Sequence, residues 1–230
     1  MVNIYLVRHG KTMFNTIGRA QGWSDTPLTK EGERGIIELG LGFKAKALTF
    51  DLAFSSDSGR TIQTMGLILK HSENEGIPYR FDPRIREWCF GSFDGGYDGE
   101  LFDGVLPRVF VENGEEQSFE AIANAIYEVD TAGWAETWET LSGRILNGFS
   151  DMAKEAQEKG AKNMIIVSHG MTIATLIKLL QPDKPRPHGL DNGSVTHLTY
   201  ENDHFSVFKV GDMSYREIGK KIMSEKHDDH

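Results

Sequence analysis

The chain has 230 residues, of which 39% are hydrophobic and 26% charged, and its formal net charge at pH 7 is −9. This length and composition are typical of one folded domain and exclude fibrous and disordered classes of protein. The negative charge argues against a nucleic-acid binder, because such proteins neutralise phosphates with a basic surface. We therefore predict one α/β domain over residues 1–230, with no nucleic-acid partner.

The cysteine count and the lengths of the apolar runs indicate in which cellular compartment the protein is expected. Cys89 is the only cysteine, which excludes an internal disulfide framework and a cysteine-rich zinc site and favours a reducing compartment. The apolar run at 3–7 has no basic segment or cleavage site before it, so no secretion signal is predicted. The longest apolar stretch, 171–180, is shorter than the roughly 20 residues of a membrane-spanning helix. We expect a cytoplasmic protein with no membrane partner.

Strand and helix signals alternate along most of the chain. Helical spacing of apolar residues follows Thr29 and Ser58 and recurs over 138–152, while 171–180 is apolar nearly all round and predicts a buried helix. Alternation of this kind predicts a three-layer α/β sandwich, with a mostly parallel central sheet flanked by helices. Short runs rich in β-branched and aromatic residues predict the strands at 3–7, 51–55, 164–168, 195–200 and 205–210.

The segment from about 91 to 135 interrupts this alternation. It begins rich in glycine and contains one short helical pattern, near 119–127. Between residues 88 and 143 the one basic residue, Arg108, faces twelve acidic ones, a net charge of −11 that leaves +2 for the rest of the chain. We interpret the segment as an insertion that forms a lid or side wall, and the tail from Lys220 as a solvated or frayed end. The acidic residues are Asp94, Asp98, Glu100, Asp103, Glu112, Glu115, Glu116, Glu120, Glu128, Asp130, Glu136 and Glu139.

Two of the predicted strands end in a histidine followed by a glycine. His9 follows Arg8 at the end of the first strand, and His169 precedes Gly170 at the end of the strand over 164–168. One such histidine is ordinarily a hydrogen-bonded turn residue. Two of them can meet at one edge of a parallel sheet, where ligands bind beyond the carboxyl ends of the strands.

A third strand end leads into a helix that begins near Arg60. The N–H groups of a first helical turn and a guanidinium group both suit a phosphate. The alternative is an exposed arginine in a capped turn. Arg8, directly beside His9, favours the phosphate interpretation.

These segments resemble the histidine phosphatase superfamily, which includes cofactor-dependent phosphoglycerate mutases and many small phosphatases. The resemblance runs from one end of the chain to the other, and the whole ordered set is far more specific than an Arg-His-Gly triplet alone. It comprises Arg8-His9-Gly10-Lys11-Thr12, Asn15, the segment 18–32, the segment around Arg60, Glu87 and Ser168-His169-Gly170.

The resemblance implies roles for five residues. His9 matches the nucleophile that carries the phosphoryl group, and Arg8, Arg60 and His169 match the positions that hold the phosphoryl oxygens. Glu87 matches the proton donor to the leaving oxygen. The alternative for Glu87 is a surface glutamate paired with a neighbouring arginine, Arg84 or Arg86. No cofactor is implied.

Five further residues, Thr12, Asn15, Gln21, Gly22 and Gly170, match positions that line the substrate pocket in relatives. For Thr12 the alternative is a helix cap, and for the segment 18–32 it is a turn-rich connection. The remaining histidines show no ligand-like spacing, so no metal site is predicted. They are His71, His188, His197, His204, His227 and His230.

The mutase branch of the family follows its catalytic glutamate with a stretch rich in lysine and arginine, which the segment 88–98 lacks. With Arg108 as its one cation, the insertion would repel a second anionic group. The resemblance thus implies a phosphomonoesterase that acts on a small phosphorylated metabolite through a phosphohistidine. The alternatives are a mutase and a catalytically silent binder of phosphorylated ligands, and the oligomeric state is not predicted. Five aromatic residues either line the leaving-group pocket or pack in the core: Trp88, Phe90, Phe93, Tyr97 and Phe102.

Overall fold

The computed structural model describes residues 1–114, 116–185, 187 and 189–228. Glu115, His188 and His230 lie outside this range, as does the side chain of His227. The strands are β1 (Val2–Arg8), β2 (Leu52–Ser55), β3 (Tyr79–Phe81), β4 (Asn163–Ser168), β5 (Val195–Glu201) and β6 (His204–Asp212). The helices are α1 (Met13–Ile17), α2 (Lys30–Ala45), α3 (Gly59–His71), α4 (Leu106–Asn113), α5 (Phe119–Val129), α6 (Trp138–Glu158), α7 (Gly170–Leu180) and α8 (Ser214–Asp228).

The described strands form one six-stranded sheet in the order β3-β2-β4-β1-β5-β6. The pairs β1–β4, β2–β4 and β2–β3 are parallel, whereas β5 is antiparallel to both β1 and β6. In the central pair Arg8 lies opposite Ser168, so β1 and β4 end side by side. The residues that follow them, His9 and His169, therefore leave the sheet at the same edge.

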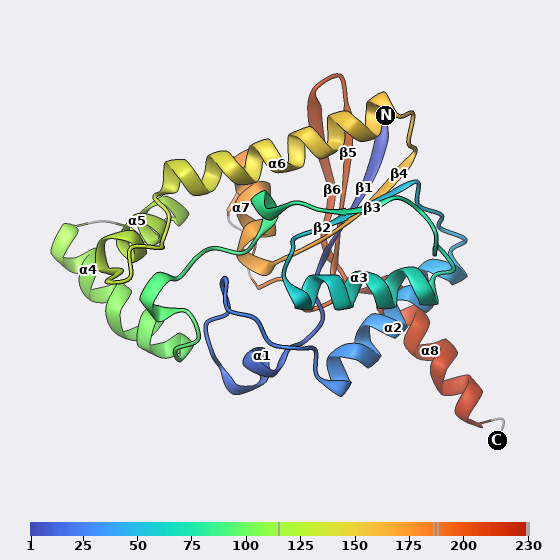
Figure 1. Cartoon of the computed structure of the whole chain (residues 1–230), viewed down its shortest axis with the longest axis horizontal. Helices are drawn as coiled ribbons and strands as arrows, with labels where there is room; N and C mark the ends of the chain where they lie inside the picture. The colour runs from blue at the N-terminus through green and yellow to red at the C-terminus, as the bar shows by residue number, and fades with distance from the viewer. Residues whose placement is uncertain (115, 186, 188, 229–230) are drawn as a thin grey trace.

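Helices cover both faces of the sheet (Figure 1), with α6 and α7 on one face and α2, α3 and α8 on the other. Side chains alternate along β1, because successive residues of a strand point to opposite faces. Ile4 and Leu6 pack into the core beneath α6 and α7, and Tyr5 and Val7 pack into the core beneath α2 and α3. Burial on both faces explains why β1 reads as a continuous apolar run, and it confirms the predicted three-layer sandwich.

All five predicted strands and the predicted helices are confirmed, but the structure also contains elements that were not predicted, among them α1. Strand β3 was not predicted, because it is a three-residue edge strand whose side chains are largely exposed. The tail from Lys220 was expected to be solvated or frayed; it is not frayed as far as Asp228, since α8 continues to there, but Lys220 and Lys221 are exposed to solvent. The anchor of α8 is a close approach to α2, where a Cβ added to Gly219 would lie 1.7 Å from the carbonyl oxygen of Glu38.

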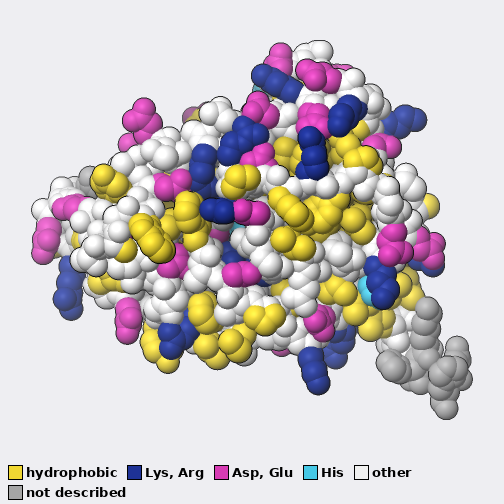
Figure 2. Space-filling model, in the orientation of Figure 1, with side chains coloured by type: hydrophobic (Ala, Val, Ile, Leu, Met, Phe, Trp, Pro, Cys, Tyr) yellow, Lys and Arg dark blue, Asp and Glu magenta, His cyan; other side chains and the backbone are white. Residues whose placement is uncertain are grey.

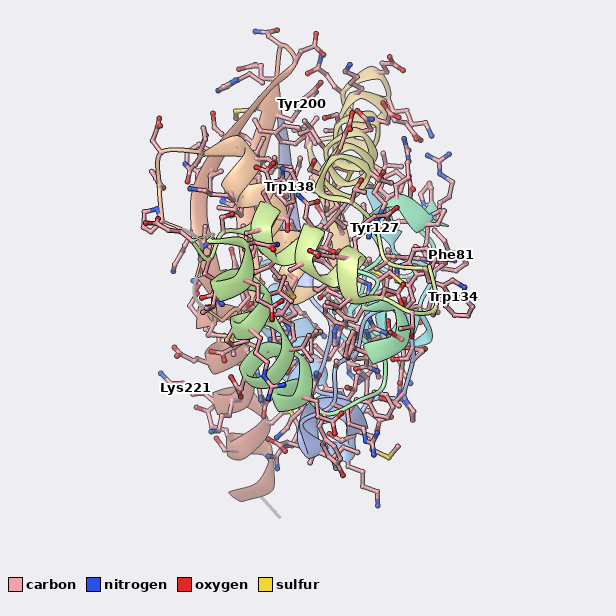
Figure 3. All side chains as sticks on the ribbon, turned by 90° about the vertical axis from the view of Figure 1, so that its left-hand side faces the viewer. Phe81, Tyr127, Trp134, Trp138, Tyr200 and Lys221 are labelled. Carbon is pink, nitrogen blue, oxygen red and sulfur yellow. The ribbon has the colours of Figure 1, made fainter. Side chains whose placement is uncertain are left out.

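The insertion is more helical than its sequence indicates. Besides α5 it contains α4 and a π-helical turn over Glu100–Val105. Sequence reasoning missed α4 because the helix is short, has proline in its first turn, where proline is tolerated, and is followed by Gly114. Figure 3 looks onto this segment, with α4 and α5 in front of the sheet. Acidic side chains lie on the surface of the left-hand end of the molecule in Figure 2, where Figure 1 places α4 and α5.

A single carboxylate, that of Asp130, closes the base of the insertion. It accepts hydrogen bonds from the backbone N–H groups of Ser92 at 2.7 Å, Ala132 at 2.8 Å, Trp134 at 2.6 Å and Ala135 at 2.8 Å. Burial raises the pKa of Asp130, but the four N–H donors together outweigh burial and hold that pKa well below its usual range. The two ends of the insertion are thus joined through an ionised group.

Asp130→Asn is expected to lower the free energy of unfolding at pH 7 by about 1–3 kcal/mol, because the amide presents one oxygen where the carboxylate presents two. A lowered carboxyl pKa stabilises the fold above the unfolded-state pKa of about 3.9, and this stabilisation is lost as the pH falls below it. The gap between wild type and variant should therefore narrow below about pH 4. Urea unfolding measures this difference in the free energy of unfolding, and Glu112→Gln, at an exposed position, is the control. An equal effect of both substitutions would contradict the role of Asp130.

Candidate active site

Two histidines far apart in the sequence lie together at the carboxyl edge of the sheet. The ring centroids of His9 and His169 are 5.3 Å apart, and the rings meet edge to face at 63°. The two side chains are 3% and 0% exposed. The sequence-based expectation that the two strand ends converge is therefore matched by the geometry.

The hydrogen bonds of His9 fix its tautomer. Its Nδ1 lies 2.8 Å from the carbonyl oxygen of Gly10, which only accepts hydrogen bonds, so Nδ1 carries the proton. The lone pair is then on Nε2, the nitrogen at the far side of the ring. A neutral imidazole held in this way presents one unprotonated nitrogen for attack on an electrophile.

His169 is held in the opposite tautomer. Its Nδ1 lies 2.9 Å from Nη2 of Arg60, which only donates, so Nδ1 accepts. Its Nε2 therefore carries the proton and donates to the hydroxyl of Ser56 at 2.7 Å. That hydroxyl lies 2.9 Å from Oγ1 of Thr61. The ring is thus fixed from both sides, by β2 and by the first turn of α3.

Both imidazoles are strongly disposed to be neutral. Burial lowers the pKa of His9 well below its usual 6.5, the positive charges of Arg60 and Arg8 lower it further, and the bond to Gly10 offsets part of this. Burial and the charge of Arg60 likewise lower the pKa of His169 well below the usual value. A neutral nucleophile is the form that the chemistry requires.

Arg60 is 0% exposed, and a loop wraps its guanidinium group. Nη1 donates to the carbonyl of Ser24 and to the carboxylate of Asp25, each at 2.9 Å. Nη2 donates to the carbonyl of Gly22 at 2.7 Å and of Gln21 at 3.3 Å, besides His169. The alternative of an exposed arginine in a capped turn is wrong, because the guanidinium group is fully buried and donates to five acceptors.

Arg8 and Arg60 each retain one buried donor. Among the described residues neither Nε atom has a hydrogen-bond partner, although Arg8 donates through Nη1 to the carbonyl of Leu190. Unsatisfied buried N–H groups are rare and cost about 1–3 kcal/mol each. Here the two unpaired donors belong to cationic groups, and these groups interact electrostatically with each other and with His9. Such a pair of donors suits a bound anion.

Glu87 is buried at the N-terminus of α7, with 6% of its surface exposed. Its Oε1 accepts from the N–H of Thr172 at 2.9 Å and of Trp88 at 3.1 Å, and from the Thr172 hydroxyl at 3.0 Å. Its Oε2 accepts from the N–H of Met171 at 3.1 Å. The alternative of a surface ion pair is wrong, because Arg84 pairs with Asp82 and Asp151, and Arg86 pairs with Asp57.

The predicted pocket residues Thr12, Gln21 and Asn15 differ in how their polar groups are used within the protein. The hydroxyl of Thr12 donates to Oε1 of Gln21 at 2.6 Å, and Gln21 donates through Nε2 to Thr26 at 2.8 Å, so these side chains bind one another. Thr12 also caps α1, which is the alternative given above for it. Asn15 uses Oδ1 to accept from the N–H of Thr12 and from Asn192, which leaves its Nδ2 donors for a ligand.

Two glycines on the predicted list are sites of close approach. A Cβ added to Gly22 would lie 2.2 Å from the carbonyl oxygen of Trp88, so only glycine lets this loop reach Arg60. Gly170 starts α7 against the Arg8 guanidinium, where an added Cβ would lie 3.2 Å from Nε. Both glycines therefore set the position of the buried arginines.

Sequence reasoning missed two residues that position the site. Asn192 donates to the carbonyl of His9 at 3.0 Å and so holds the His9 backbone from the loop before β5. Arg144 of α6 donates to the carbonyls of Arg84, Arg86 and Glu87, each at 2.9 Å, and pairs with Glu136. Neither residue stands in a motif, and we found no signal in the sequence that would have identified them.

A cavity of about 350 Å³ is lined by Arg8 and Gly170, the sequence neighbours of His9 and His169. Arg8, Glu87 and Gly170 line its inner end, and the insertion contributes Phe102, Gln117, Phe119 and Ile122 to its wall. The other described lining residues are Met171, Ala174, Pro187, Gly189 and Leu190.

Of the five aromatic residues left open between pocket and core, Phe102 lines the cavity. Trp88 and Phe90 are 1% and 4% exposed and pack in the core, and Phe93 packs against it. Tyr97 is 53% exposed and stacks on the guanidinium of Arg19. The aromatic wall thus consists of Phe102 and of Phe119, which the sequence did not single out.

Two searches of the described residues bear on other classes of function. No helix among them is both long and apolar enough to cross a bilayer. No group of three or more histidine, cysteine, aspartate or glutamate side chains among them is arranged to hold a metal ion.

Comparisons with known proteins agree with this geometry. Residues 4–213 match the family model "Histidine phosphatase superfamily (branch 1)". The broad-specificity phosphatase YOR283W of Saccharomyces cerevisiae is 27% identical over 98% of this chain and 92% of its own. A probable phosphoglycerate mutase GpmB of Cronobacter sakazakii is 30% identical over 94% of this chain and 95% of its own length. A crystal structure of phosphoglycerate mutase from Bacillus anthracis superposes with a TM-score of 0.87 at 37% identity, over 95% of this chain and 96% of that one. The chain belongs to the histidine phosphatase superfamily.

Proposed function

We propose that this protein is a metal-independent phosphomonoesterase that hydrolyses small phosphorylated metabolites through a phosphohistidine at His9. The observation that carries the proposal is the pairing of a neutral, oriented His9 with two guanidinium groups that, among the described residues, each retain a buried, unpaired N–H. Together they supply a nucleophile and a receptor for the phosphoryl oxygens at one point.

In the first step the lone pair on Nε2 of His9 attacks phosphorus, the N–P bond forms and the bond from phosphorus to the leaving oxygen breaks. Arg8 and Arg60 offset the charge on the equatorial oxygens, with their Nε donors already desolvated. The Gly10 carbonyl, bonded to the proton on Nδ1, stabilises the positive charge that the ring acquires as it attacks.

Glu87 acts on the leaving oxygen. It lines the same cavity as Arg8, and its Oε2 accepts one hydrogen bond from the protein, whereas Oε1 accepts three. A proton on Oε2 passes to the leaving oxygen in the first step. In the second step Glu87 takes a proton from the attacking water, the N–P bond breaks and inorganic phosphate leaves.

The walls of the cavity favour hydrolysis over the mutase reaction. Isomerisation of a phosphoglycerate needs a positive group for its carboxylate, and Arg8 is the one cation among the described lining residues. Arg108, the cation of the insertion, lines a separate hollow with Asp103, Pro107 and Val111. The related mutases keep the mutase reaction as the second candidate, and a silent binder of phosphorylated ligands as the third.

The reaction type is tested by measuring phosphate release and 3-phosphoglycerate isomerisation side by side. We expect release from aryl and alkyl phosphates to exceed isomerisation, with transient acid-labile, base-stable phosphate on the protein. His9→Ala should abolish both turnover and this phosphate, and EDTA should change neither in the wild type. Isomerisation that outpaces release would favour the mutase. Absence of both turnover and labile phosphate would favour the binder, and restoration of an EDTA-treated enzyme by metal would overturn metal independence.

Glu87→Gln should distinguish substrates by leaving group. Release of an alkoxide needs a proton, whereas a nitrophenolate leaves without one. We expect the variant to lose about 10²–10³-fold in kcat on alkyl phosphates and less than about tenfold on p-nitrophenyl phosphate. Asp82→Asn, on the same segment but paired with Arg84, is the control. Equal losses on both substrates would remove Glu87 from the acid role.

The protonation state of His9 is also measurable. A lowered histidine pKa means that the folded protein binds fewer protons than the unfolded chain below about pH 6.5, so stability falls as the pH drops through that value. NMR of the free protein should show His9 and His169 still neutral at a pH where an exposed histidine, with its usual pKa of about 6.5, is already protonated, with His9→Gln used for assignment. A titration midpoint of His9 at or above the usual value of about 6.5 would contradict the neutral nucleophile.

A further inference from the structure

We propose that the substrates of this site are phosphate monoesters of uncharged, largely apolar alcohols, which bind with the alcohol portion against the insertion. The inference rests on the proposed hydrolase function and adds the class of leaving group. It depends on the chemistry of the cavity beyond the phosphoryl site, which the family resemblance left undetermined.

The lining of the cavity combines two charged side chains with a larger apolar set. Arg8 and Glu87, which the proposed mechanism places at the reacting group, are the charged members, and the insertion contributes a wall of Phe102, Phe119 and Ile122. Met171 and Ala174 of α7 and Leu190 of the loop before β5 add further apolar side chains. An ester bound with its phosphoryl group at the arginines thus places its alcohol carbon chain among these side chains, where burial of each methylene is favourable.

The charges in and around the cavity disfavour an anionic alcohol portion. In the described part of the lining Arg8 is the one cation and Glu87 the one carboxylate, and the phosphoryl group occupies Arg8. The insertion that forms the far wall carries a large excess of acidic residues. A carboxylate or second phosphate on the substrate would lose its hydration there and gain no partner among these side chains.

The apolar wall is held in place before any ligand arrives. The ring of Phe119 packs edge to face on Trp88, with 5.7 Å between centroids, and the ring of Phe102 packs in the same way on Phe90 at 5.8 Å. Trp88 is itself anchored, since its indole N–H donates to the hydroxyl of Thr175 at 3.0 Å. A wall whose members are fixed by core contacts binds an apolar group without a further ordering cost.

The size of the cavity limits the alcohol. At about 350 Å³ it lies at the low end of the range of small-molecule sites, roughly 300–1,000 Å³. A single ring or a short alkyl chain fits this size, and Gln117 at the rim offers one polar contact.

The test is a series of straight-chain substrates: ethyl, butyl and hexyl phosphate, together with 6-(phosphonooxy)hexanoate, which has the hexyl length and a terminal carboxylate. The alcohols of the alkyl series have nearly the same acidity, so differences in kcat/KM report binding of the chain rather than leaving-group chemistry. We expect kcat/KM to rise about threefold per methylene, and the carboxylated ester to fall at least about tenfold below hexyl phosphate.

Two variants and one control substitution locate the effect. Phe102→Ala should flatten the rise from ethyl to hexyl phosphate by about fivefold or more, whereas Phe81→Ala, the same change at an exposed ring on β3, should leave the whole series unchanged. Gln117→Lys places a cation at the rim and should raise the ratio of carboxylated to hexyl ester by about 1.5- to 5-fold.

A series that stays flat while ethyl phosphate is hydrolysed would overturn this inference and leave the hydrolase proposal standing. A carboxylated ester that equals or exceeds hexyl phosphate would do the same. No phosphate release from any ester, p-nitrophenyl phosphate included, would overturn the hydrolase proposal and this inference with it.

Discussion

The structure of the site depends on the burial of one cation, the guanidinium of Arg60. A fully buried guanidinium is stable only if its N–H groups are paired, because the cost of an unpaired buried charge is several kcal/mol. The loop from Gln21 to Asp25 folds back to supply its acceptors, and His169 supplies another. The one donor left over, Nε, has no partner among the described residues and suits a phosphoryl oxygen.

This constraint also determines the chemistry of the two histidines. Arg60 donates to Nδ1 of His169 and thereby makes that ring a donor toward Ser56, while its charge disfavours protonation of His9. His9 takes the complementary tautomer through the Gly10 carbonyl. Equivalent side chains at the ends of β1 and β4 thus differ in function because their neighbours differ: the lone pair of His9 is available, and that of His169 is used by Arg60.

The fold and the grouping of His9, Arg60 and His169 were predictable because their signals are local. His9, Arg60 and His169 each follow a strand, and the parallel topology brings strand ends to one edge. Other features arise from contacts between segments distant in the sequence. The hydrogen bonds of Asn192 to the His9 carbonyl and of Arg144 to the Glu87 carbonyl are examples, and neither could be predicted without coordinates. The same is true of α8, whose charged sequence hides its close packing on α2 through glycine.

The insertion illustrates the difference between a charge and its position. A count of acidic residues predicts that an anion is repelled, but it does not say which side chains face the substrate. In the structure the acidic excess sits in a segment whose inner wall is Phe102, Phe119 and Ile122, and its one cation, Arg108, lines another hollow. The acidic residues of the insertion and its apolar inner wall both disfavour a second anionic group on the substrate. The apolar wall alone also favours a longer carbon chain. The phosphoryl site and the apolar wall can therefore be altered independently, because Arg8 and Glu87 are held by α7 and the sheet edge, whereas the wall of Phe102, Phe119 and Ile122 belongs to the insertion.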